Sequence, residues 1–194
     1  MDSKETCYFR ALYDVVVVVN SSLEPQEVLR AVVGEAAAAT GAKGCSILLL
    51  SPDRRELRHT VSYGLSDRFL AKGPVRVDLS MSESLEGRAV SVRDAVSDPR
   101  IQYGGQNRAE GVASILSVPM RLKGEVIGVA RLYSSTQRDF GPEETEFLEA
   151  VAHLGAIALA NAREHQELKT NLEMVTSYIY NDTWYGQSVA DQKR

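Results

Sequence analysis

The residue of this chain best suited to binding chemistry is Arg131, which interrupts an otherwise apolar strand. Strand alternation places Ile127, Val129 and Tyr133 on the same side as Arg131. A charged side chain in such a place is rarely fully buried unless it is paired. Arg131 therefore either forms an ion pair, for which Asp94 is a candidate partner, or reaches into a cavity and recognises an anion.

The histidines and cysteines do not form a recognisable metal or redox motif. His59, His153 and His165 are far apart and have no metal-ligand spacing, so we predict no metal site. His59 lies on an apolar strand face, where a hydrogen-bonded core or edge histidine is the simpler interpretation. Cys45 opens an apolar strand and is expected to be buried, Cys7 lies near the N-terminus, and there is no CxxC pair.

Composition and motifs also argue against several functional classes. There is no GxSxG sequence, no P-loop and no cysteine–histidine pairing, so we expect no enzyme. A formal net charge of −4 without a basic cluster argues against a nucleic-acid surface. The acidic, polar N-terminus is not a signal peptide and the apolar runs are too short to span a bilayer, so we expect a cytoplasmic protein without a membrane partner.

A strand hairpin at residues 111–133 organises the predicted fold. Its strands are Ala113–Leu122 and Val126–Tyr133, and Gly124 in the turn between them supplies a positive φ. Both strands are almost continuously apolar, which indicates that both faces are covered and that the hairpin lies at the centre of a sheet.

Two helices and two strands are expected before the hairpin. Residues 8–20 form a helix or a strand, because the β-branched run at 15–19 allows either, and residues 26–40 form an amphipathic helix that ends at Gly41. Strands follow at 45–51 and 56–64. Alternation in the second strand predicts one shared face for Leu57, His59, Val61 and Tyr63.

The segment from Leu65 to Glu110 has no sustained periodicity. It contains a possible short helix at 67–72, a possible short strand at 75–79, and a helical turn for which Ser82 is the expected cap. Irregular segments of this length in compact domains are usually functional or disordered.

A long helix is predicted from Pro142, and its apolar residues follow the alternating spacing of a coiled coil. Its first half can pack on the sheet, but a partner helix is needed to cover the later residues. We expect a homodimer interface at this helix, formed by Leu154, Asn161, Leu168, Leu172 and Val175. The aromatic tail that contains Trp184 and Tyr185 either packs on the domain or a partner, or is disordered.

Two sequences in the hairpin resemble the signature of GAF domains, which are small-molecule sensor modules related in fold to PAS domains. They are Ser114-Ile-Leu-Ser-Val-Pro-Met and Gly124-Glu-Val-Ile-Gly-Val-Ala, and the resemblance extends over roughly residues 12–167. It implies a helix at 8–20 and an α+β fold with an antiparallel sheet. The implied strand order is 2-1-5-4-3, counting the strands along the chain.

The resemblance also implies the layers around the sheet. Three helices should cover one face, residues 65–110 should form an irregular lid over the other, and a long C-terminal helix should close the domain. We expect the domain at residues 1–166 and a helical extension and tail at 167–194.

The same resemblance places a ligand pocket between the sheet and the lid. The expected wall contains Val61, Tyr63, Leu85, Asp94, Tyr103, Ser117, Val129 and Arg131. Neither the ligand nor any cofactor can be named from the sequence. The lid has no cysteine, which argues against a GAF-like reductase and against bilin attachment.

The motif of cyclic-nucleotide GAF domains, Asn-Lys…Phe…Asp-Glu, is altered here. Ser134-Ser135 stand near the first pair, Phe140 matches, and Glu144-Thr145 replace the last pair, which argues against a cyclic nucleotide. We therefore predict a non-catalytic sensor that binds a small molecule and signals through a dimeric helix, with a separate signalling protein as a candidate partner. The alternative is a ligand-free scaffold for dimerisation or protein interaction with a collapsed pocket.

Overall fold

The computed structural model describes residues 3–21 and 24–191 of the chain. The chain forms two units, Met1–Leu159 and Ala160–Arg194. The division lies within the long C-terminal helix, which also contains the expected boundary after residue 166.

Six antiparallel strands form the sheet of the first unit, in the order β3-β2-β1-β6-β5-β4. The strands are β1 (Gly44–Leu50), β2 (Glu56–Tyr63), β3 (Val75–Arg76), β4 (Val90–Val92), β5 (Ser114–Leu122) and β6 (Glu125–Ser134). The predicted hairpin is β5 and β6, and its turn has positive φ at Lys123 (51°) and Gly124 (88°). These strands confirm the predicted antiparallel sheet and the central position of the hairpin.

The predicted position of the strand at residues 75–79 is wrong. β3 pairs with β2 at the opposite edge, through Leu57 and Val75, instead of lying beside β5. The edge beside β5 is occupied by β4, which pairs Val90 with Ser117. β4 has only three residues, so it is too short to show the alternation by which strands are recognised.

A β-bulge in β2 divides the strand into two halves that face opposite ways. Ile47 of β1 lies opposite Val61, whereas the next residue, Leu48, lies opposite His59, so Thr60 is the extra residue. Val61 belongs to the core under the helices, and Tyr63 lies against Gly34, 3.6 Å from the position a Cβ would take there. The predicted common face of Leu57, His59, Val61 and Tyr63 is therefore wrong.

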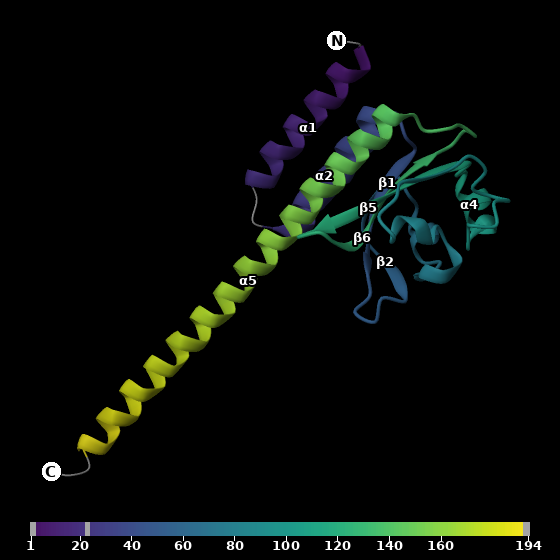
Figure 1. The fold of residues 1–194 in the computed structure, drawn as a ribbon. Helices are drawn as coiled ribbons and strands as arrows, with labels where there is room; N and C mark the ends of the chain where they lie inside the picture. Colours follow the sequence, from purple (N-terminus) through teal and green to yellow (C-terminus); the bar gives the residue numbers. More distant parts are fainter. Residues whose placement is uncertain (1–2, 22–23, 192–194) are drawn as a thin grey trace. The chain divides into compact units, whose positions relative to one another are not determined.

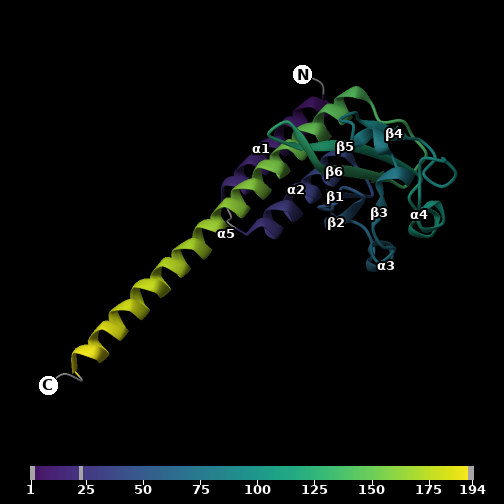
Figure 2. The same ribbon diagram turned by 60° about the horizontal axis from the view of Figure 1, so that its bottom comes forward.

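Three helices lie on one face of the sheet, as predicted, but the N-terminal helix packs on the outer side of the second helix (Figures 1 and 2). They are α1 (Ser3–Ser21), α2 (Pro25–Thr40) and, within the first unit, the start of α5 (Pro142–Asp191). The core between them is apolar and includes Val15, Val32, Ile47, Leu116, Val118, Leu132, Leu148 and Val151.

Apart from the edge strands β3 and β4, residues 65–110 lie on the other face of the sheet. Their α-helices are α3 (Asp67–Leu70) and α4 (Gly104–Glu110) (Figure 2). Two smaller apolar clusters join this lid to the sheet, one around Phe69 and Tyr133 and one around Leu48 and Val129. Ser82 is not a helix cap. It begins a 3-10 turn at Ser82–Ser84 that has no side-chain cap, and Met81 before it adopts a left-handed conformation.

The second unit continues the helical backbone of α5 to Asp191. Leu168 and Leu172 are each 67% exposed, and Asn161 is also exposed. The side chains of Val175, Trp184 and Tyr185 lie outside the described residues. Among the helices that the structure describes, none is both long and apolar enough to cross a membrane.

Candidate functional site

The candidate site is built around Arg131, on the lid face of the sheet. Alternation along β6 points Val129, Arg131 and Tyr133 to this face, as the apolar clusters show for the two neighbours. Arg131 is only 4% exposed. Its Nε donates to Ser117 Oγ of β5 at 3.3 Å, while its Nη2 has no hydrogen-bond partner among the described residues.

A buried guanidinium nitrogen without a partner is costly, because charged groups lose much of their hydration energy on burial. Burial lowers the pKa of Arg131, and the hydroxyl of Tyr133 beside it opposes that shift. The arginine therefore offers a charged donor that the described part of the protein leaves unused.

Asp94 is not the ion-pair partner of Arg131. Its carboxylate accepts hydrogen bonds from the backbone of Val96 and Ser97 and, at 2.6 Å, from the hydroxyl of Ser97. These bonds, the one from the Ser97 hydroxyl first, lower the pKa of Asp94. Asp94 thus stabilises the turn after β4, and the predicted pairing is wrong because local backbone donors occupy the carboxylate.

His59 was not predicted as part of the site, but it lies on the lid face next to these groups. Both of its ring nitrogens are buried and have no hydrogen-bond partner within the described chain. Burial, together with the positive charges of Lys72 and Arg131, lowers the pKa of His59 to about 3. The expected hydrogen-bonded core histidine is therefore a neutral imidazole with unused polar atoms.

Lys72, which follows α3, brings an amine to the site beside the guanidinium of Arg131. Its Nζ lies 3.0 Å from the centre of the Phe69 ring and 5.8 Å from that of Tyr103. Burial, helped by Arg131 and opposed by Glu110, lowers the pKa of Lys72 to about 7. No periodic pattern in the sequence marks Lys72, because only the fold of the lid brings it to the sheet.

Phe69 of α3 is the aromatic centre on which these groups meet. Its ring is in edge contact with His59, at 6.5 Å between ring centres, and with Tyr133, at 5.8 Å. The Tyr133 hydroxyl shares a 2.9 Å hydrogen bond with Ser46 Oγ of β1, which holds that ring in place. Phe69 thereby joins the lid directly to β2 and β6, and Tyr133 extends this contact to β1.

The structure places five of the eight predicted wall residues on the lid side of the sheet, and Arg131 is one of these five. Val129 is buried in the apolar cluster there, and Leu85 and Tyr103 pack against the same cluster. Ser117 binds Arg131, and Tyr103 donates to the carbonyl of Pro74 at 2.9 Å. Val61 and Tyr63 do not belong to this wall, because the bulge turns them to the helical face.

Among the hollows lined by described residues, two lie on the lid side and at the sheet edge, and neither of these two is lined by Arg131. One, of about 610 Å³, lies between α3 and α4 and includes Phe69 and Glu110 in its lining. The other lies beside β3 and includes Arg54 and Arg76. Phe69 is thus shared by the first hollow and the cluster of nitrogen groups around it.

The described residues contain no group of three or more histidine, cysteine or acidic side chains that could hold a metal ion. Cys45 is buried on the helical face, where burial raises the pKa of its thiol to about 12. Cys7 is exposed on α1. The two thiols therefore lie on the helical side of the sheet and not on the lid face.

Comparisons with known proteins place this fold in a family. A family model described as GAF domain matches residues 22–160. This chain belongs to the GAF domain family. No curated protein sequence matches it, so the remaining comparisons are with solved structures.

The GAF domain is similar in structure to several others of low sequence identity. The GAF domain of a phosphoenolpyruvate-protein phosphotransferase from Coxiella burnetii is 19% identical, with a TM-score of 0.75 over 86% of this chain and 99% of that one. Its Acinetobacter counterpart is 21% identical, with a TM-score of 0.68 over 84% and 97%. A free methionine-R-sulfoxide reductase from Neisseria meningitidis, in complex with its substrate, is 17% identical, with a TM-score of 0.70 over 85% and 95%.

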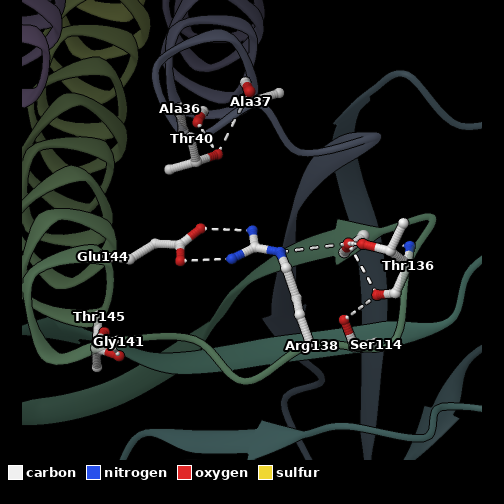
Figure 3. A network of polar contacts seen from close by, with 10 residues as sticks. Ala36, Ala37, Thr40, Ser114, Thr136, Arg138, Gly141, Glu144 and Thr145 are labelled. Atoms are coloured by element: carbon white, nitrogen blue, oxygen red, sulfur yellow. Dashed lines mark hydrogen bonds and ion pairs between the residues drawn. The ribbon is translucent and has the colours of Figure 1, made fainter. Parts of the chain in front are cut away.

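In this GAF domain, Arg138 contacts three of the positions compared above with the cyclic-nucleotide motif, and Figure 3 shows its pair with Glu144. Two nitrogens of Arg138 donate to the two carboxylate oxygens of Glu144, each at 2.7 Å, and the guanidinium lies 4.2 Å from the centre of the Phe140 ring. Arg138 Nε also donates to Ser134 Oγ at the end of β6, at 3.4 Å. These contacts fasten the strand that carries Arg131 to the first turn of α5.

Proposed function

We propose that this GAF domain is a sensory module whose lid face binds a small molecule through Arg131. The observation that supports this proposal is the buried Nη2 of Arg131, which has no hydrogen-bond partner among the described residues. A fold that buries a guanidinium between a sheet and a lid has a group ready to accept a negatively charged or strongly polar ligand.

Signalling in this proposal runs from β6 to α5. A ligand on Arg131 would act on a strand whose end is bonded to Arg138, and Arg138 in turn binds Glu144 in the first turn of the helix. We further propose that α5 pairs with its copy in a homodimer, through Leu154, Asn161, Leu168, Leu172 and Val175. Leu154 is partly buried against the domain core, so its share of such an interface is smaller than that of exposed Leu168 and Leu172.

The proposed sensor is non-catalytic. The reductase from Neisseria meningitidis shares the fold, but the lid of this chain contains no cysteine and its two thiols lie on other elements. The groups gathered at Arg131 are hydrogen-bond donors suited to binding a ligand.

A ligand-free scaffold is the alternative function. It is favoured by the position of the two hollows, neither of which is lined by Arg131, and by the packing of Leu85 and Tyr103 against the sheet. In that case the domain would serve only to pair the α5 helices.

Mass spectrometry of small molecules released from the purified protein separates these functions. The sensor predicts a released compound that rebinds, and Arg131→Ala should weaken an anionic compound by about 1.5–3 kcal/mol, the range for hydrogen bonds to charged groups. Arg93→Ala is the matched control, because Arg93 is exposed and pairs with Asp139 on the surface. Unchanged calorimetric affinity in Arg131→Ala, with the fold intact by circular dichroism, removes Arg131 from the site.

A further inference from the structure

The nitrogen groups on the lid face carry more positive charge than the acid beside them, Glu110, balances. Arg131 and Lys72 both lower the pKa of His59, and Arg131 also lowers that of Lys72, because each positive charge disfavours a further one nearby. Glu110 is the acidic group that opposes the shift of Lys72, but its carboxylate already accepts hydrogen bonds from the backbone and the hydroxyl of Ser66.

The unused atoms of this cluster are mostly hydrogen-bond donors. Arg131 contributes its buried Nη2. A protonated Lys72, whose Nζ lies over the Phe69 ring, contributes N–H donors as well. A neutral His59 contributes one N–H and one acceptor nitrogen. A ligand that completes the site must therefore bring oxygen acceptors and negative charge.

We propose that the lid-face site binds a compact oxyanion, the carboxylate or phosphate group of a small molecule, through Arg131 and Lys72 with His59 as a third donor. This inference rests on the proposed function, since it names the class of ligand for the same site. Oxygen acceptors bound by charged donors form the stronger class of hydrogen bonds, and the anion would offset the repulsion between the cations.

Other ligand classes fit these groups less well. A cation would be repelled by Arg131 and Lys72. A neutral apolar molecule would leave the buried nitrogens of Arg131 and His59 without partners. The rings of Phe69, Tyr103 and Tyr133 surround the cluster, which favours a small charged group at this point over a bulky one.

Binding of the oxyanion should bring a proton to Lys72. Its neighbours are His59 from β2, Arg131 from β6, Glu110 from α4, and the rings of Phe69 and Tyr103. With a pKa of about 7, the amine is part-protonated near neutral pH, and an adjacent anion favours its charged form. Net proton uptake on binding follows.

The test is calorimetry of the full chain at pH 7, with succinate and inorganic phosphate as probes and succinamide as the neutral match of succinate. Titrations in PIPES and in Tris, which differ in ionisation heat, measure proton uptake. We expect at least one anion to bind, with a heat that depends on the buffer, and succinamide not to bind. The anion that binds distinguishes a carboxylate from a phosphate ligand.

Substitutions of Lys72 test whether this residue binds the anion and takes up the proton. Lys72→Met should weaken the bound anion at least about tenfold and abolish the buffer dependence. Lys72→Arg keeps the charge without a proton to gain at pH 7, so it should retain most of the affinity and lose only the buffer dependence. Lys123→Met, at the exposed hairpin turn, is the matched control and should behave as the wild type.

Three results overturn the inference. A released molecule that is neutral or cationic, with no binding of either anion, contradicts the ligand class while leaving the proposed sensor function in place. Anion binding that is unchanged in both Lys72→Met and Arg131→Ala contradicts the assigned residues. Absence of any released molecule, with no binding of any probe, removes the proposed function and this inference together.

Discussion

At the scale of single residues, His59 links the site to the stability of the fold. An imidazole buried with two unused nitrogens is stable only in its neutral form, because nothing nearby compensates a positive charge. An ordinary histidine takes up a proton near pH 6.5, whereas the pKa of His59 in the folded protein is about 3. Between these values the unfolded chain binds more protons, so stability falls as the pH falls.

The variant His59→Phe tests this link between protonation and stability in the absence of any ligand. The wild type should lose about 2.5 kcal/mol of unfolding free energy through this group between pH 7 and pH 4.5, and His59→Phe, which cannot take up a proton, should not show this loss. Urea denaturation at the two pH values measures it. His153→Phe, on the exposed face of α5, is the control. Equal pH dependence in wild type and His59→Phe would show that the imidazole is solvated.

At the scale of elements, a close approach of β1 to β6 explains a glycine in the hairpin. A Cβ on Gly128 would lie 2.3 Å from the carbonyl oxygen of Leu48 and 3.0 Å from the Cα of Leu49, both backbone atoms in the centre of the sheet. The sheet cannot move to make room without breaking its own ladder.

Gly128→Ala should therefore destabilise the domain by about 3 kcal/mol, the upper part of the range for overpacked sites. Thermal or urea unfolding measures the change. Gly105→Ala is the control, because a Cβ at Gly105 in α4 meets no atom within 4 Å and alanine is the better helix former. A Gly128→Ala protein as stable as the wild type would mean that β1 and β6 are farther apart than described.

The Arg138–Glu144 ion pair belongs to a second contact between elements, which joins the end of β6 to α5. Its side chains are 32% and 9% exposed, whereas those of the Arg93–Asp139 pair are 64% and 70% exposed. Glu144→Gln should cost about 1–3 kcal/mol, because it leaves Arg138 partly buried without a counter-charge. Asp139→Asn should change the unfolding free energy by less than about 1 kcal/mol, as is usual for exposed pairs.

A double-mutant cycle with Arg138→Met isolates the coupling energy of the pair. If Glu144→Gln and Asp139→Asn prove equally mild, then the link between β6 and α5 contributes little to the fold. The transmission route in the proposed function would lose its support as well.

At the scale of the whole molecule, the proposed dimer depends on the apolar residues of α5 beyond Leu159. Leu168 and Leu172 are exposed in the single chain and keep the spacing of a coiled-coil seam. Soluble proteins seldom leave such a stripe uncovered. Burial of each leucine should contribute roughly 1.5–3 kcal/mol to association, less the cost of ordering.

The double change Leu168→Glu, Leu172→Glu should therefore yield a folded monomer, measured by light scattering with circular dichroism. Met174→Glu, Ser177→Glu adds the same charge outside the seam and should leave the oligomeric state unchanged. Wild-type protein that is monomeric at concentrations of about tens of micromolar would defeat the proposed dimer, since interfaces of micromolar affinity are populated there.

The amino-acid sequence by itself determined the helix at 26–40, the long C-terminal helix and the hairpin, because periodicity and turn residues are local signals. The helix at 8–20 and the antiparallel class of the sheet were implied by the resemblance to GAF domains. The sequence also identified Arg131, since a charge within an apolar strand is visible without a fold. Only the tertiary structure decided which edge β3 and β4 occupy and where β2 changes face. A bulge is one extra residue relative to a partner strand, so Thr60 is recognisable only once β1 lies beside it. The meeting of His59, Lys72 and Arg131 likewise depends on the folded lid, which brings Lys72 to strands from distant parts of the chain.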